Sequence, residues 1–217
     1  MGRQADMKRR RPMPPQGLGD LSGDAPHTSI VPAEGLGLWV QETFIREGGA
    51  LFNPDHQHLA TADLEFLWAG SAFEKQGRTV LGQAEEVMFR AGGWQKERQE
   101  QQMLEWFGHI PKFLITLAAD YCAQSSDADF CALVEHELYH VGQKKDDFGA
   151  PAFTRDGLPK LGIRGHDVEE FLGVVKRYGV GDPGGALAQL AGLARGTPEV
   201  SRSAVAGACG TCLLKAA

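Results

Sequence analysis

The sequence predicts an α+β domain in which a small, mainly antiparallel sheet packs against one central helix. Three observations carry this prediction. Strand-like segments and segments of helical periodicity follow one another along the middle of the chain. Residues 112–118 form a short, apolar segment, and a capped amphipathic helix is expected to begin soon after it, near Asp127. The length of 217 residues fits one such domain with additional segments at its ends.

The composition divides the chain into three parts. Residues 1–32 are rich in Arg, Pro, Gly, Asp and Ser and are expected to form a flexible arm. Residues 33–179 are the expected folded domain, and residues 180–217 are a Gly- and Ala-rich tail. The arm begins with five basic residues against one acidic residue, so it could contact nucleic acid or an acidic partner, although a solvated terminus is the favoured interpretation.

The first elements of the domain are a helix and two strands. Apolar residues at helical spacing in residues 35–47 predict a short amphipathic helix, which the following pair of glycines ends. Residues 63–68 and 78–82 have the composition of two strands around a Gly-containing connection. The polar segment 96–102 interrupts the pattern before the apolar, partly β-branched strand 112–118.

The second half of the domain is expected to be mainly helical. Ser126 and Asp129 form a capping pattern, so a helix should begin near Asp127 and could stop at Gly142. Its apolar residues form one stripe for the core: Phe130, Leu133, Val134, Leu138 and Val141. A loop over residues 147–160, a helix over residues 166–178 and a weak helix over residues 186–194 should follow.

Charge and hydropathy exclude several classes of protein. The formal net charge of −6 argues against a protein that coats nucleic acid. No segment approaches the roughly 20 apolar residues of a membrane helix, and the basic start is followed by Pro and Gly, so a cytoplasmic protein without membrane contact is expected. The four cysteines are too few and too unevenly placed for a disulfide framework, and Cys209 and Cys212 are interpreted as an incidental pair.

His136 and His140 lie one helical turn apart, on a side of the expected helix away from its apolar stripe. Side chains at i and i+4 share a helix face, so both imidazoles can bind one zinc ion at about 2.0–2.1 Å. Glu137 could then act as general base on a water molecule, because zinc lowers the pKa of water toward about 7. We therefore expect one Zn²⁺ ion, with Glu137 as the catalytic residue.

A zinc hydrolase needs a third protein ligand, and the next candidates follow some 25 residues later. His166 is favoured, while Glu169 and Glu170 remain alternatives. A group of this set that does not bind the metal could accept a hydrogen bond from a ligating imidazole. Arg164 or Tyr178 could stabilise the negatively charged oxygen of a tetrahedral intermediate.

The other histidines are weaker candidates. His56 and His58 share a polar loop and are expected to be exposed to solvent, whereas His109 is expected to pack near aromatic residues.

The motif His136-Glu137-Leu138-Tyr139-His140, paired with the downstream GHDVEEF segment at residues 165–171, resembles the phage metallopeptidase family, a zincin-like group encoded by phages and prophages. The resemblance covers about residues 53–179. It implies a zincin fold, one zinc ion, ligand roles for the two histidines and the base role for Glu137, but no substrate. SprT-like proteases, which act on DNA-bound proteins, are similar only in general layout, and the extended motif of metzincins is missing.

These observations favour a zinc-dependent peptidase that acts on proteins or peptides. The strand at residues 112–118 could present an edge that aligns an extended substrate. One alternative is a non-enzymatic phage or prophage interaction module in which the zinc site is structural. Another is a DNA-associated, SprT-like protease whose basic arm, Arg3 to Arg11, contacts DNA.

Overall fold

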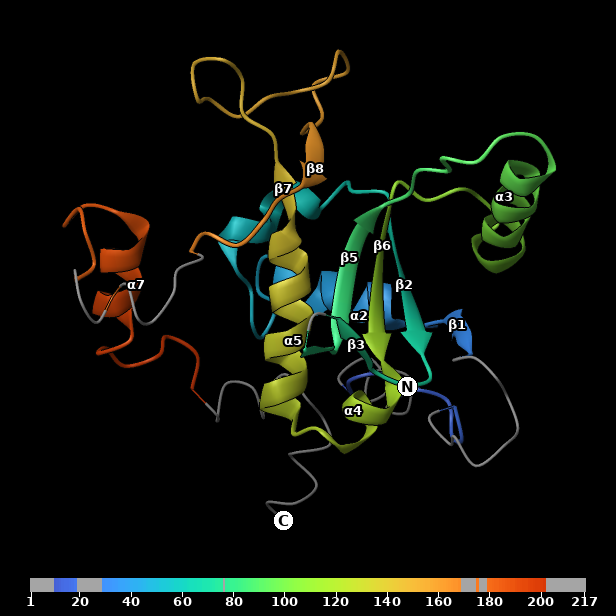
Figure 1. Ribbon diagram of the computed structural model, residues 1–217, viewed down its shortest axis with the longest axis horizontal. Helices are drawn as coiled ribbons and strands as arrows, with labels where there is room; N and C mark the ends of the chain where they lie inside the picture. The colour runs from blue at the N-terminus through green and yellow to red at the C-terminus, as the bar shows by residue number, and fades with distance from the viewer. Residues whose placement is uncertain (1–9, 19–28, 76, 169–174, 176–178, 202–217) are drawn as a thin grey trace.

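The computed structural model describes residues 10–18, 29–75, 77–168, 175 and 179–201. Its centre is a four-stranded sheet in the order β1-β2-β6-β5 (Figure 1). The sheet consists of β1 (Ile30–Pro32), β2 (Leu64–Ala69), β6 (Phe113–Ala118) and β5 (Gly82–Glu86). The β1–β2 and β5–β6 pairs are antiparallel, and β2–β6 is parallel. The predicted α+β fold with a mainly antiparallel sheet is therefore confirmed.

The predicted strand at residues 112–118 is confirmed as β6, but the prediction that it forms an edge is wrong. β6 pairs with β2 on one side and with β5 on the other. Five of its six residues are buried, because side chains on both faces of the strand are covered. An apolar segment without polar alternation is typical of such an interior strand. The edges of the sheet are β1 and β5.

One face of the sheet packs against α5 (Asp127–His140) and α2 (Leu36–Val40). α2 continues as the π-helical segment Gln41–Ile45, so the helix predicted for residues 35–47 is confirmed. Alternate residues of β6 point into this core: Phe113, Ile115 and Leu117. From α5 the core receives the predicted stripe, in which Phe130, Val134, Leu138 and the following Val141 are fully buried and Leu133 is partly buried.

α5 begins where its capping residues predict. The side-chain oxygen of Ser126 accepts a hydrogen bond from the backbone N–H of Asp129 at 3.2 Å, a cap that contributes about 1 kcal/mol. The helix ends at His140, earlier than the stop expected at Gly142, because β7 (Val141–Gln143) begins at the next residue. Pairing of β7 with β8 (Leu161–Ile163) replaces a further helical turn.

The opposite face of the sheet is covered in part by α3 (Trp94–Phe107). The polar segment 96–102 lies inside this helix, so the expectation that it only interrupts the pattern is wrong. Met103 is the single buried residue of α3, where it packs on Leu67 and Leu114. A helix that buries so little shows almost no apolar periodicity, which is the signal from which helices are predicted.

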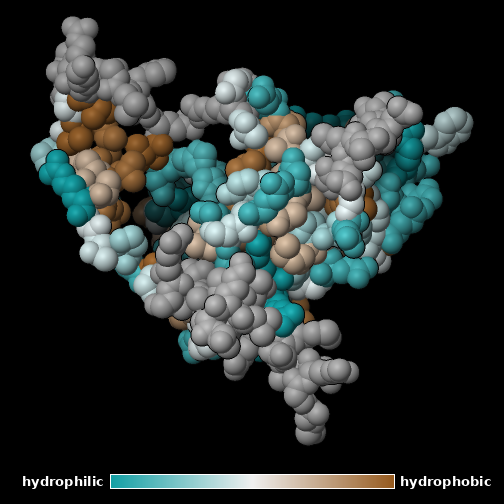
Figure 2. Space-filling view, turned by 90° about the horizontal axis from the view of Figure 1, so that it is seen from below, coloured by the Kyte–Doolittle hydropathy of each residue, from teal (hydrophilic) through white to brown (hydrophobic). Residues whose placement is uncertain are grey.

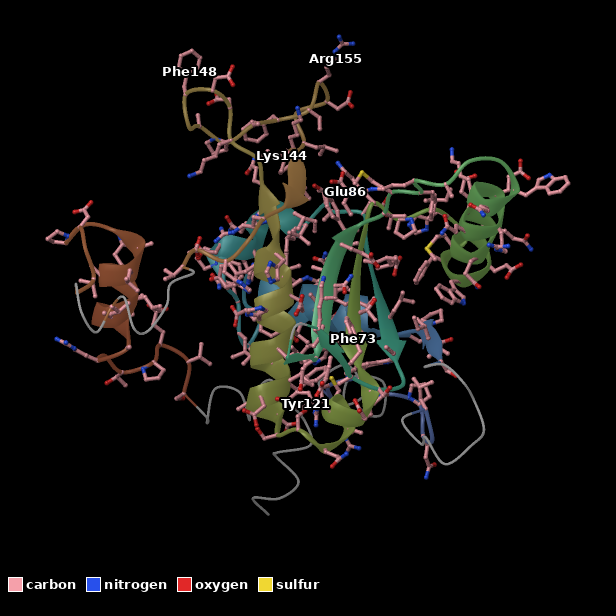
Figure 3. All side chains as sticks on the ribbon, viewed as in Figure 1. Phe73, Glu86, Tyr121, Lys144, Phe148 and Arg155 are labelled. Carbon is pink, nitrogen blue, oxygen red and sulfur yellow. The ribbon has the colours of Figure 1, made fainter. Side chains whose placement is uncertain are left out.

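Two hairpins flank the sheet. β3 (Phe73–Lys75) pairs with β4 (Arg78–Val80), so the strand predicted for residues 78–82 is divided between β4 and β5. The segment 144–160 connects β7 to β8, in agreement with the loop predicted for residues 147–160. Figure 3 shows Phe148 and Arg155 at two separate tips of this segment, away from the sheet.

Three short elements complete the described fold: the 3₁₀ helix Pro54–Leu59, α4 (Ala119–Gln124) and α7 (Ala186–Leu193). α7 confirms the weak helix predicted for residues 186–194. None of its residues is buried, and its apolar side chains form the brown surface at the left of the view in Figure 2. Residues 166–168 are not helical, and the rest of the helix predicted for 166–178 lies outside the described residues except at 175.

The basic arm is partly folded, which corrects the prediction of a flexible segment over residues 1–32. β1 belongs to the sheet, and Arg11 is buried beneath α5. The Arg11 guanidinium forms an ion pair with Asp127 at 2.6 Å, donates hydrogen bonds to the carbonyls of Cys122 and Ser125, and lies 4.7 Å from the Phe130 ring centroid. The composition of residues 1–32 predicted a solvent-exposed arm, because composition does not reveal that Arg11 has a buried acidic partner far along the chain.

Among the described helices, none combines the length and apolar composition needed to cross a bilayer. Cys122 and Cys131 are both buried, and burial raises the pKa of the Cys122 thiol to about 12. Cys209 and Cys212 lie outside the described residues.

Candidate metal centre

The structure brings His136, His140 and His166 together at the end of α5. The Nε2 atom of His136 lies 3.3 Å from Nε2 of His140 and 3.2 Å from Nε2 of His166. One potential ligand atom from each residue lies within 4.8 Å of the other two. Two nitrogens bound to one tetrahedral zinc ion are about 3.3 Å apart, so the cluster has the spacing and the donor chemistry of a zinc site.

The β7–β8 hairpin sets the orientation of His140. The backbone N–H of Arg164 donates to the carbonyl of His140, and the Arg164 carbonyl lies 2.9 Å from Nδ1 of the same histidine. Because a carbonyl only accepts hydrogen bonds, Nδ1 carries the proton and Nε2 keeps its lone pair for the cluster. The same hairpin returns the chain to His166, which explains how residues far apart in sequence meet here.

The environment of His136 favours the neutral imidazole that metal binding requires. Burial lowers its pKa, and the neighbouring imidazoles of His140 and His166 lower it further when they are charged.

Glu137 lies next to the histidine cluster, between α5 and β5. Its side chain is only 4% exposed, and the backbone N–H of Ala84 donates a hydrogen bond to its carboxylate. Gly82 leaves the space that this carboxylate occupies, since a Cβ at that position would lie 2.5 Å from Oε1 of Glu137. Burial raises the pKa of Glu137, while His140 and the Ala84 N–H act in the opposite direction.

A groove of approximately 820 Å³ runs along α5 past these residues. One wall is the outer face of α5 from Asp129 to His140, and the other is the segment 79–84 of β4 and β5. Asp129 and His140 are eleven residue rises apart along the helix, or roughly 16 Å, which matches about five residues of an extended peptide. His166 and Arg164 line the end of the groove beyond His140.

In the described part of the chain, no strand pairs with the edge of β5 that borders this groove, so this edge is called the free edge. Leu81 accepts a hydrogen bond from Ala118 of β6, and Val87 donates one to Lys112, so the odd-numbered residues of β5 face β6. In an antiparallel pair the intervening residues turn their N–H and C=O groups outward. Gly82, Ala84 and Glu86 therefore carry the polar groups of the free edge, and the Ala84 N–H contacts Glu137.

The family model described as Putative phage metallopeptidase matches residues 38–195, well over half of the chain. The chain belongs to this family. No curated protein and no solved structure matches it. Membership in a metallopeptidase family implies a metal cofactor and protein or peptide substrates. The match also extends beyond the resemblance noted over residues 53–179 and crosses the predicted domain boundary at 179.

Of the two groups considered for stabilising an oxyanion, only Arg164 lies among the described residues. Its guanidinium forms an ion pair with Asp167, and its aliphatic carbons lie over Gly142. The side chain lines the groove beside His140 and His166. Tyr178 and the alternative ligands Glu169 and Glu170 lie outside the described residues.

A polar network joins α5 to the segment 53–56. Asn53 donates to Glu135 at 2.8 Å and lies 2.9 Å from the hydroxyl of Tyr139, which donates to Asp55 at 3.0 Å. Nε2 of His56 lies 3.5 Å from Glu135. Sequence reasoning missed this network, although Asn53 before Pro54 is a recognisable capping signal for the segment that carries it.

The expectations for the other histidines are wrong. His56 is fully buried rather than exposed, and its ring lies 4.5 Å from that of Tyr139. His58 is half-buried, with Nε2 lying 2.7 Å from the carbonyl of Val141. His109 is exposed rather than packed and lies 2.9 Å from Asp63, which helps to raise its pKa. Each of these rings has a structural partner that only the folded chain reveals.

Proposed function

We propose that this protein is a zinc-dependent peptidase in which His136, His140 and His166 hold one zinc ion and Glu137 is the general base. The observation that carries the proposal is the position of a three-histidine cluster and a buried carboxylate in one groove beside a free strand edge. When bound, zinc supplies Lewis-acid chemistry that polarises the scissile carbonyl and makes water acidic enough to react near neutral pH.

Glu137 transfers the protons of the reaction. Its carboxylate takes a proton from the attacking water and later delivers it to the nitrogen of the leaving amine. The Ala84 N–H holds the carboxylate in place, and burial moves its pKa toward the range in which a group can both accept and release a proton. Gly82 has no side chain and therefore leaves room for the Glu137 carboxylate.

The free edge of β5 aligns the substrate. An extended peptide in the groove can pair by β-addition with the outward-facing backbone groups of Gly82, which lines the groove, and this backbone pairing orients the scissile bond along α5. β5 thus takes the role that the sequence suggested for residues 112–118. Arg164 would stabilise the negative charge on the carbonyl oxygen by exchanging its contact with Asp167 for one with the substrate.

The location of the cluster supports catalysis over a structural metal. Structural zinc sites are closed by four protein ligands, whereas catalytic sites keep a position open to water or substrate. Here the described residues supply three imidazoles that line an open groove. A DNA-associated protease is supported less well, because Arg11, one of the residues expected to contact DNA, is buried in an ion pair.

The test is cleavage of chemically unfolded proteins by the zinc-loaded protein and by its Glu137→Gln variant, followed by mass spectrometry of the products. Loss of the general base should reduce cleavage by about 10²- to 10⁴-fold. The exposed Glu34→Gln variant serves as the control for removal of one carboxylate and should cleave normally. Equal cleavage by the Glu137 variant, or no cleavage by the zinc-loaded protein, would rule out the proposal.

A further inference from the structure

A second cavity, the apolar pocket, lies on the face of the sheet opposite α5. It has a volume of approximately 230 Å³. Its floor and walls include residues from all four strands of the sheet and from the β3–β4 hairpin: Ile30, Ala69, Gln83, Thr116, Phe73 and Val80. Figure 3 shows Phe73 close to the lower part of β5 and β6.

The apolar pocket and the groove are separated by a single segment of chain. Residues 80–83 line both cavities, so the groove lies on one side of this segment and the pocket on the other. Gly82 contacts Glu137 on the groove side. Gln83, the next residue, pairs with Thr116 and faces the pocket side.

A peptide paired with β5 would reach both sides of the sheet. Successive side chains of an extended strand point to opposite faces, so one set points toward the metal helix and the alternate set toward the face that holds the apolar pocket. Because Gly82 borders both Glu137 and the pocket, the side chain nearest the pocket belongs to a residue within about two positions of the cleaved bond.

The size and lining of the pocket indicate what it can hold. Sites for small-molecule ligands usually measure about 300–1,000 Å³, whereas an apolar cavity of about 150 Å³ accommodates benzene. A volume of 230 Å³ therefore suits one aromatic or large aliphatic side chain. Glu85 also lines the cavity and would repel an acidic side chain.

We propose that the apolar pocket selects substrates, so that the peptidase cleaves extended segments that carry a large apolar residue within about two positions of the scissile bond. The inference rests on the proposed peptidase function, since it assigns a substrate class to the same groove. Phe73 and Val80 are the specificity-determining side chains, because they pair across the hairpin and form one wall of the pocket.

Two variants test the pocket. Phe73→Ala removes part of a wall, and because Phe73 is 50% exposed the change should leave the fold intact. Thr116→Phe fills the pocket from its floor. Phe148→Ala is the matched control, since it also removes a phenylalanine side chain. Phe148 is 95% exposed and lies at a tip of the segment 144–160, away from the pocket (Figure 3).

The first measurement maps cleavage sites in an unfolded proteome by mass spectrometry. The wild-type protein and Phe148→Ala should share an enrichment of Phe, Leu or Met at one fixed position near the cleaved bond. Phe73→Ala and Thr116→Phe should lose that enrichment. A wild-type profile without any apolar preference, or a Phe73→Ala profile identical to that of Phe148→Ala, overturns the inference.

The second measurement separates this inference from the peptidase proposal. Zinc-loaded Glu137→Gln protein is titrated with otherwise identical ten-residue peptides that contain one Phe or one Ser, and binding is followed by fluorescence anisotropy. A hydrophobic pocket should favour Phe by about tenfold or more, and Phe73→Ala in the same background should abolish the difference. If this preference is found while the wild-type protein cleaves nothing, the pocket is retained and the peptidase proposal fails. Equal binding of the two peptides contradicts the pocket.

Discussion

The carboxylate of Glu137 occupies the space where a side chain at residue 82 would lie, with Oε1 only 2.5 Å from the position of a Cβ on Gly82. β5 can approach α5 this closely because residue 82 has no side chain. Only the folded chain makes this contact, since Gly82 and Glu137 lie 55 positions apart in the sequence. It makes Gly82 a positioning residue for the proposed general base.

Gly82→Ala should therefore impair turnover without unfolding the protein. The added methyl group must displace the Glu137 carboxylate, and a misplacement of about 1 Å in a catalytic group can cost roughly 100-fold in rate. Zinc content should not change, because the three histidines are untouched. The measurement is kcat together with zinc content and thermal stability.

The control for this substitution is Gly92→Ala, since a Cβ at residue 92 meets no atom within 4 Å. Its kcat should equal that of the wild-type protein. If kcat of Gly82→Ala is undiminished, the position of the Glu137 carboxylate does not depend on the absence of a side chain at residue 82.

Arg11→Ala should destabilise the fold by about 3–5 kcal/mol. The ion pair between Arg11 and Asp127 is buried, and removal of one partner leaves the other charge in the protein interior. Arg10→Ala removes a neighbouring but exposed arginine and should change stability by less than about 0.5 kcal/mol. Urea unfolding measures the free energy of unfolding of both variants. Equal values for Arg11→Ala and Arg10→Ala would show that the arm does not contribute to the stability of the fold.

Glu135→Gln should reveal a pH-dependent contribution to stability. Burial alone would raise the pKa of Glu135, but the neighbouring His56 imidazole and a hydrogen bond from Asn53 outweigh burial and hold the pKa below 4.5. A carboxyl with a lowered folded-state pKa contributes stability above its unfolded pKa and loses it as the pH falls through the folded value. The stability difference between wild type and variant should thus be largest near pH 7 and shrink below about pH 4.5.

Urea unfolding at several pH values between 7 and 3 checks this dependence, with the exposed Glu47→Gln variant as the reference for a carboxyl outside the network. A difference that stays constant over the whole range would mean that the contacts of Glu135 with His56 and Asn53 do not determine its titration.

The parts of the fold that depend on local signals were predictable from the sequence. The Ser126 cap and the apolar stripe define α5, and the helical period alone places His136 and His140 on one face. His166 was the favoured third member of the cluster from its type and position, although the hairpin that delivers it was not predicted.

Features that depend on tertiary contacts were not predictable. α3 was missed because it buries only Met103, and the burial of Arg11 depends on Asp127, which a charge count cannot identify as a partner. The edge strand was assigned to residues 112–118 because apolar composition marks a strand but does not give its place in the sheet. β5, the strand that borders Glu137, has the less apolar sequence GQAEE.

Elemental analysis of the purified, dialysed protein tests whether three imidazoles hold one zinc ion beside Glu137. One zinc ion per chain is expected in the wild-type protein and in Glu137→Gln. The ion should be lost in His136→Ala, His140→Ala and His166→Ala, but not in the control His109→Ala, which removes an exposed imidazole outside the cluster. A wild-type protein that binds no zinc, or histidine variants that retain a full complement, would rule out the three-histidine zinc site.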